Sequence, residues 1–210
     1  MTLRGEGAIL TQSLAVGGTA VEQLYERNAG RVFAYCLVRV GSQNVAEWAV
    51  TATLVRDNQP ALTVVHVPLT GDTYTAVAGA GAHLNGQPLH VSQTPSLALS
   101  VVATSQARPD EAEAVTRRVG ASITAMLFDA LVVRTAVPAT LHLLNVAAGQ
   151  IDAFWQFAGA RADLLPGALL VTEAGGQISD AEGHPWTPKS ESFLAAAPGV
   201  HAEAVATLSR

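Results

Sequence analysis

The feature that most constrains the fold is a series of short β-branched segments, each closed by a turn signal, in the first half of the chain. Trp48–Val55 and Ala61–Val67 are two such segments, and Asp57–Pro60 between them has the Asp, Asn and Pro residues that favour a turn. Gly79–Gly81 marks another tight bend. Upstream, Val32–Val40 is almost continuously apolar and predicts a buried strand. This meander predicts an antiparallel sheet.

After Pro109 the pattern changes to helices that alternate with strands. The predicted helices are Pro109–Arg118, Pro138–Ala148, Asp163–Ala174 and His201–Leu208, and the predicted strands between them are Ile151–Phe157, Gln177–Ser179 and Phe193–Ala196. Strands first and alternating elements later predict a layered α+β protein. We expect one compact unit with two lobes, an antiparallel-sheet lobe at residues 1–108 and a mixed α/β lobe at residues 109–210.

Composition limits the partners and the compartment. Of the 210 residues, 49% are hydrophobic and 14% are charged, which is enough apolar material for a substantial core. The net charge is −5 and no run of Lys or Arg occurs, so nucleic acid and anionic membranes are poor partners. Cys36 is the single cysteine, and Met1–Leu10 lacks the pattern of a signal peptide. We therefore expect a cytoplasmic protein that binds a small molecule.

Three stretches follow, in order and spacing, the motifs of one enzyme family. The first is Trp48–Val55 with Val64–Pro68 and Tyr74–Gly86, the second is Val146–Ala153, and the third is Asp163–Gly176. Together they resemble the inositol monophosphatase superfamily, and the meander is especially similar to its nucleotide-bisphosphate phosphatase branch. The resemblance implies an αβαβα sandwich with an antiparallel sheet first, a smaller mixed sheet second and a shortened N-terminal helical region. It also implies a homodimer.

The family holds Mg²⁺ ions with carboxylates from three motifs, because hard cations take oxygen ligands. Counting back from Trp48, the two aspartates of the first motif fall on Phe33 and Cys36. The adjacent glutamates of the second motif occur nowhere in the chain, and the third motif keeps only Asp163, after Ala162. These replacements predict that Mg²⁺ is not held, that no cofactor is used, and that the floor of the site is apolar.

Asp163 has two interpretations, a catalytic acid or base and the N-cap of its helix, where Asp is favoured. The family fold implies that Tyr35 to Val38 face Asp163 across a mostly apolar pocket. The candidate pocket residues are Phe33, Tyr35, Cys36, Val38, Arg39, Arg161 and Trp155.

Each candidate also has an ordinary structural interpretation. Cys36 in an apolar strand is either a nucleophile or inert core. Tyr35 and Arg39 either point toward the site or have ordinary structural roles, Tyr35 as an interior hydroxyl and Arg39 as a solvated strand end. Trp155 belongs either to a pocket wall or to normal packing, and Arg161 is placed to pair with Asp163.

Three functional hypotheses follow. The leading one is a degenerate member of the family whose cleft binds or converts a mostly apolar small molecule without metal, for example in a biosynthetic pathway. The second is a Mg²⁺-dependent phosphatase acting on a sugar or nucleotide phosphate. The third is a non-catalytic dimeric interaction subunit.

Overall fold

The computed structural model describes residues 49–56, 59–105, 107, 111–157 and 161–210. The predicted strand at residues 32–40 therefore lies outside the described residues, as does the predicted shortened N-terminal helical region. Among the described residues, no helix is long and apolar enough to cross a membrane.

The first sheet, sheet A, is the meander that the β-branched segments predict. Its strands are β1 (Val50–Arg56), β2 (Gln59–Val67), β3 (Asp72–Val77), β4 (Gly81–Leu84) and β5 (Gln87–Pro88). They lie in sequence order, and each pairs antiparallel with the next. The predicted antiparallel pairing of the first two β-branched segments is confirmed, with Ala52 opposite Val64.

The second sheet, sheet B, is mixed, as expected. Its strands are β6 (Val101–Thr104), β7 (Val132–Thr135), β8 (Ala153–Phe157), β9 (Gln177–Ser179) and β10 (Ser192–Ala196). The spatial order is β7-β6-β8-β10-β9. Strand β6 runs parallel to both β7 and β8, whereas β10 is antiparallel to β8 and β9.

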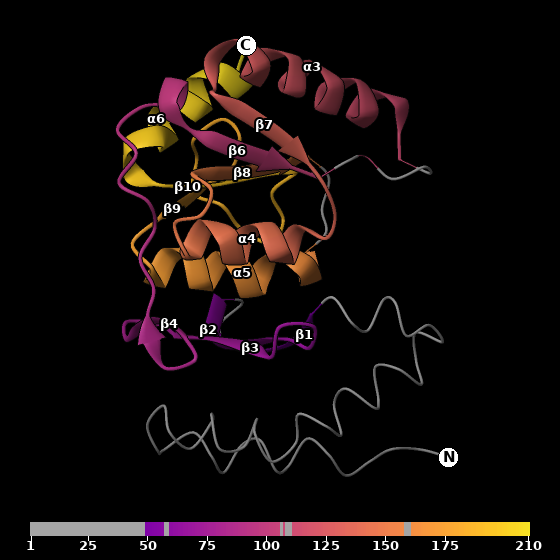
Figure 1. Ribbon diagram of the computed structural model, residues 1–210. Helices are drawn as coiled ribbons and strands as arrows, with labels where there is room; N and C mark the ends of the chain where they lie inside the picture. The colour runs from indigo at the N-terminus through magenta and orange to yellow at the C-terminus, as the bar shows by residue number, and fades with distance from the viewer. Residues whose placement is uncertain (1–48, 57–58, 106, 108–110, 158–160) are drawn as a thin grey trace, which may run out of the picture.

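Helices separate and cover the sheets. They are α3 (Glu113–Asp129), α4 (Ala139–Ala147), α5 (Arg161–Glu173) and α6 (Pro198–Leu208), with a short 3-10 helix at Leu97–Leu99. Figure 1 shows α4 and α5 between the two sheets, and α3 and α6 on the far side of sheet B. The described layers therefore run β, α, β, α, which confirms the α+β sandwich and matches the last four layers of an αβαβα arrangement.

The core divides along the two faces of sheet B because successive side chains of a strand point to opposite faces. Phe154 packs in one apolar cluster with Leu143 of α4 and Leu170 of α5. Trp155, its neighbour in β8, packs in the other cluster with Met126 of α3. Sheet B is therefore buried on both faces.

Some predicted boundaries differ from the structure. The helix expected at Pro109–Arg118 begins at Glu113 and runs on to Asp129, and β4, β5 and β7 were not predicted. Leu89–Val91, a short apolar segment that also predicts a strand, forms none, and its Val91 N–H is bonded to the Ala174 carbonyl after α5 instead of to a neighbouring strand. The division into lobes at residue 108 stays a prediction, and β6, which precedes it, belongs to sheet B.

Candidate functional site

The carboxyl ends of the parallel strands β6, β7 and β8 meet at one edge of sheet B. The chain leaves these ends toward α3, α4 and α5 respectively. Helix α3 covers one face of the sheet and α5 covers the other (Figure 1), so the connections after the neighbouring strands β6 and β8 diverge there. In open sheets of parallel strands, ligands bind at such a switch point.

Two polar side chains meet at this point. Ser105 follows β6, and its hydroxyl donates a 2.8 Å hydrogen bond to Oε1 of Gln156, near the end of β8. Ser105 is buried and Gln156 is partly buried. This pair was not predicted from the sequence. The signal that could have identified it is that each residue lies at the end of a strand that is followed by a helix, as in a parallel unit.

A histidine from α4 lies close to the same edge. The His142 ring stacks on the Phe154 ring with 5.5 Å between centroids, and its Nε2 lies 3.1 Å from the carbonyl oxygen of Ala136. Burial lowers the pKa of His142, and the bond to the Ala136 carbonyl opposes that shift. His142 is thus favoured in its neutral form, with Nε2 donating to the carbonyl.

Asp163 lies in the first turn of α5, which follows β8. Its side chain is exposed and forms no hydrogen bond or ion pair with another described residue. The helix begins at Arg161, so Asp163 is inside the first turn and not at the N-cap. A carboxylate there is favoured by the positive end of the helix dipole and is open to a ligand.

The other predicted site residues are not brought to Asp163 by the described structure. Trp155 is fully buried on the α3 face of sheet B, where its indole N–H donates a 2.9 Å bond to the Ser122 hydroxyl. Arg161 begins α5, but its side chain is outside the described structure. The remaining candidates lie outside the described residues altogether: Phe33, Tyr35, Cys36, Val38 and Arg39.

Two other motif acids have structural roles. Asp152 accepts bonds from the Ser92 hydroxyl at 2.5 Å and the Val101 N–H at 2.6 Å. Glu173 accepts the N–H groups of Gly79 and Gly81. In the described part of the chain, no group of three or more His, Cys, Asp or Glu residues is placed to hold a metal ion. The described residues therefore do not complete a Mg²⁺ site around the Asp163 carboxylate.

Comparison with known proteins gives one consistent result. A model of the inositol monophosphatase family matches residues 42–210. The inositol-1-monophosphatase ImpA of Mycolicibacterium smegmatis is 32% identical over 154 residues, covering 73% of this chain and 56% of that relative. The Nus factor SuhB of Pseudomonas aeruginosa is 38% identical over 126 residues, covering 57% and 44%.

Solved structures agree with the sequence matches. The suppressor protein SuhB from Bartonella henselae superposes with a TM-score of 0.72 at 25% identity, covering 77% of this chain and 62% of that one. The inositol monophosphatase from Anabaena gives a TM-score of 0.69 at 26% identity, covering 77% and 63%. The chain spans about half the length of the curated relatives it matches.

These matches correct one expectation from the sequence. The replacements at Phe33 and Cys36 predicted a protein that uses no cofactor, but the family that matches residues 42–210 is Mg²⁺-dependent. The prediction was wrong because it inferred the absence of the metal from the loss of some carboxylates, and a site with fewer ligands can still depend on Mg²⁺.

Proposed function

Because the chain belongs to the inositol monophosphatase family, we propose that it binds a small phosphate monoester, of the sugar or nucleotide class, and hydrolyses it with Mg²⁺. The observation that carries the proposal is the Asp163 carboxylate in the first turn of α5. It is exposed and forms no hydrogen bond or ion pair with another described residue. When bound, Mg²⁺ would supply charge neutralisation for the phosphate and an activated water.

The edge of sheet B at which β8 ends also carries polar side chains. The Ser105–Gln156 pair lies at the end of β8, and Asp163 follows that strand in the chain. A hydroxyl and an amide are groups that orient the hydroxyls of a sugar. The names of the relatives, among them an inositol-1-monophosphatase, agree with this ligand class.

The sequence also predicts how the activity departs from that of a typical family member. The paired glutamates of the second motif are missing, and a gap-free count back from Trp48 puts Phe33 and Cys36 at the aspartate positions of the first motif. Fewer carboxylates mean weaker attraction for a divalent cation. We therefore propose a degenerate site with slow turnover that needs Mg²⁺ in the millimolar range. A single cysteine suits a cytoplasmic location, which we retain as part of the proposal.

The test measures phosphate release from inositol 1-phosphate and adenosine 3′,5′-bisphosphate, with Mg²⁺ and with EDTA. We expect release only with Mg²⁺, and a loss of at least tenfold in Asp163→Asn, roughly the effect of weakening a metal site. Glu113→Gln, which removes an exposed acid of α3, is the matched control. Release that is unchanged by EDTA, or equal in Asp163→Asn and Glu113→Gln, would contradict the proposal.

We also propose that the chain forms a homodimer through one apolar surface. Large apolar side chains are exposed where α3 ends and β7 begins: Leu127, Phe128, Leu131 and Val132, with Phe128 85% exposed. Strand β7 is an edge strand of sheet B. An exposed apolar patch beside an unpaired strand edge is typical of an interface.

Light scattering after size exclusion tests the dimer. Phe128→Asp should shift the protein toward monomer, because it buries a charge in the interface. Leu69→Asp is the matched control, since Leu69 is 86% exposed in the turn between β2 and β3. A Phe128→Asp variant with the same mass distribution as Leu69→Asp would place the interface elsewhere.

A further inference from the structure

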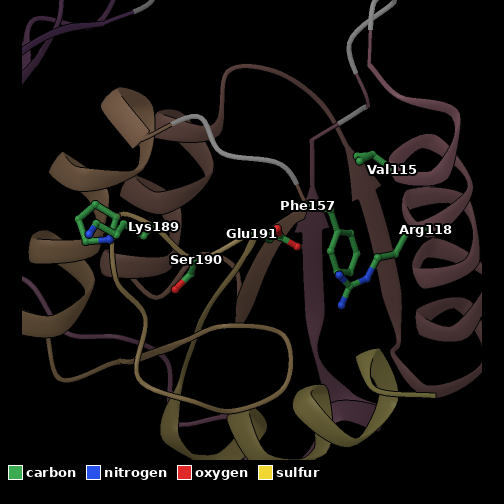
Figure 2. A pocket seen from close by; sticks show the side chains of 7 residues that line it. Val115, Arg118, Phe157, Lys189, Ser190 and Glu191 are labelled. Carbon is green, nitrogen blue, oxygen red and sulfur yellow. The ribbon is translucent and has the colours of Figure 1, made fainter.

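A hollow of about 380 Å³ lies beside α3, on the opposite face of sheet B from the candidate site. Figure 2 shows it between α3 and the segment that precedes β10. Phe157, which is 6% exposed, lines it, with Val115 and Pro188 as further apolar contacts. Strand alternation directs Gln156 to the other face, so the two sites are separate. The volume is in the range of small-molecule pockets.

Arg118 lines the hollow, and its positive charge is neutralised by an ion pair. The Arg118 guanidinium lies over the Phe157 ring, 4.3 Å from its centroid, and forms an ion pair with Glu182. Stacking on the ring and pairing with the carboxylate both hold the guanidinium in place. Arg118 therefore shapes the hollow without leaving a net charge there.

Two other charges line the hollow and remain available. Lys189 and Glu191 are both exposed, and neither forms an ion pair with any described residue, including each other. A ligand with one charge would leave one of them unmatched. A ligand with one charge of each sign matches both, and electrostatic complementarity of this kind sets specificity.

We propose that this hollow binds a small zwitterion with an apolar body, of the α-amino acid class. The ligand carboxylate pairs with the Lys189 ammonium and the ligand ammonium pairs with the Glu191 carboxylate. The ligand side chain packs on Phe157, Val115 and Pro188. This site is independent of Mg²⁺ and of phosphate hydrolysis.

Lys189 provides a direct probe, because it is the only lysine in the chain. Reductive dimethylation with ¹³C keeps its positive charge and gives one lysine signal in the NMR spectrum, apart from that of the N-terminal amine. We titrate the labelled protein with L-leucine, L-methionine and L-phenylalanine. A saturable shift of the Lys189 signal with at least one of them is expected.

Removing either ligand charge tests the zwitterion requirement. N-acetyl-L-leucine lacks the ammonium and L-leucine amide lacks the carboxylate, and each should bind roughly threefold to fivefold more weakly than L-leucine, as expected for exposed ion pairs. In Glu191→Gln the discrimination against N-acetyl-L-leucine should disappear. Glu113→Gln, which removes an α3 acid that does not line the hollow, should keep it.

Three outcomes would overturn the proposal. They are the absence of a saturable shift with all three amino acids, equal affinity for L-leucine and N-acetyl-L-leucine in the unmutated protein, and unchanged discrimination in Glu191→Gln with a native circular dichroism spectrum. None depends on metal or on phosphatase activity. Failure here therefore leaves the proposed function untouched, and the reverse also holds.

Discussion

The hydroxyl of Thr140 donates a 3.0 Å hydrogen bond to the main-chain carbonyl of Asp163. Thr140 lies in the first turn of α4 and Asp163 in the first turn of α5, and these helices follow different strands of sheet B. The bond therefore ties the starts of the two helices together. It fixes the backbone from which the candidate carboxylate projects.

Thr140→Val tests this tie. Valine keeps the shape of threonine but removes the donor, so the bond to the Asp163 carbonyl is lost at a position where Thr140 is buried. We expect the free energy of unfolding to fall by about 1 kcal/mol, as for a typical hydrogen bond. Urea denaturation measures the change. Thr140→Ser keeps the hydroxyl and reports the methyl group separately; a Thr140→Val variant as stable as the unmutated protein would show that the bond contributes nothing.

Glu173→Gln tests the link between α5 and sheet A. The two carboxylate oxygens of Glu173 accept the N–H groups of Gly79 at 2.8 Å and Gly81 at 2.9 Å. Glutamine keeps only one acceptor and turns an amide NH₂ toward the other N–H. We expect a loss of about 1–2 kcal/mol in urea denaturation, because bonds to a charged group are stronger than neutral ones. Thr172→Ala, a change at an exposed neighbour, should lose distinctly less.

Most of the fold was predictable because local pattern and tertiary structure agree. The β-branched segments and the Asp57–Pro60 turn signal gave the pairing of β1 with β2. The extension of α3 to Asp129 was missed because Gly120, Ser122 and Thr124 are weak helix formers. Tertiary contacts compensate: Ser122 accepts the Trp155 indole N–H, and Val119 and Met126 are buried.

The candidate site was only partly predictable. Asp163 was named as a candidate because its motif is local in sequence, and the structure shows that it lies in the first turn of α5. Ser105 and Gln156 were missed because they are 51 positions apart and meet only when β6 and β8 pair. Successive side chains of a strand point to opposite faces of the sheet. Trp155, which is close to Asp163 in sequence, therefore packs on the other face of sheet B.

Stability should fall on acidification through the protonation of His201. Its Nε2 lies 2.9 Å from the Ser179 hydroxyl, which donates to the Asp180 carbonyl, so the ring donates to the serine oxygen. Burial lowers the pKa of His201 below its usual 6.5. As the pH falls below 6.5, His201 therefore takes up a proton in the unfolded chain before it does so in the folded chain. The free energy of unfolding decreases as the pH falls from 6.5 to the pKa of His201 in the folded protein.

His201→Gln should flatten this dependence below pH 6.5, because glutamine can donate to Ser179 and does not titrate. The measurement is the urea midpoint at several pH values. His142, whose pKa is also lowered by burial, contributes with the same sign, so some dependence should remain. His90→Gln is the control at an exposed position. If the urea midpoint depends on pH equally in His201→Gln and in the unmutated protein, His201 does not cause the loss of stability in acid.

Gly167→Ala should destabilise the protein even though alanine favours a helix over glycine by about 1 kcal/mol. Gly167 lies within α5, where α4 approaches so closely that an added Cβ would be 2.3 Å from Cβ and 2.4 Å from Cδ1 of Leu143. The helices must then move apart, which costs about 1–3 kcal/mol for an overpacked core and more where backbone has to shift.

Gly120→Ala in α3 is the matched control for Gly167→Ala, since nothing lies within 4 Å of its added Cβ. That variant should gain about 0.5–1 kcal/mol from helix propensity alone. Leu143→Ala should not rescue Gly167→Ala, because alanine retains the Cβ that is 2.3 Å away. If Gly167→Ala gains stability as Gly120→Ala does, then α4 and α5 are not packed at this distance, and the Thr140–Asp163 tie would lose its basis as well.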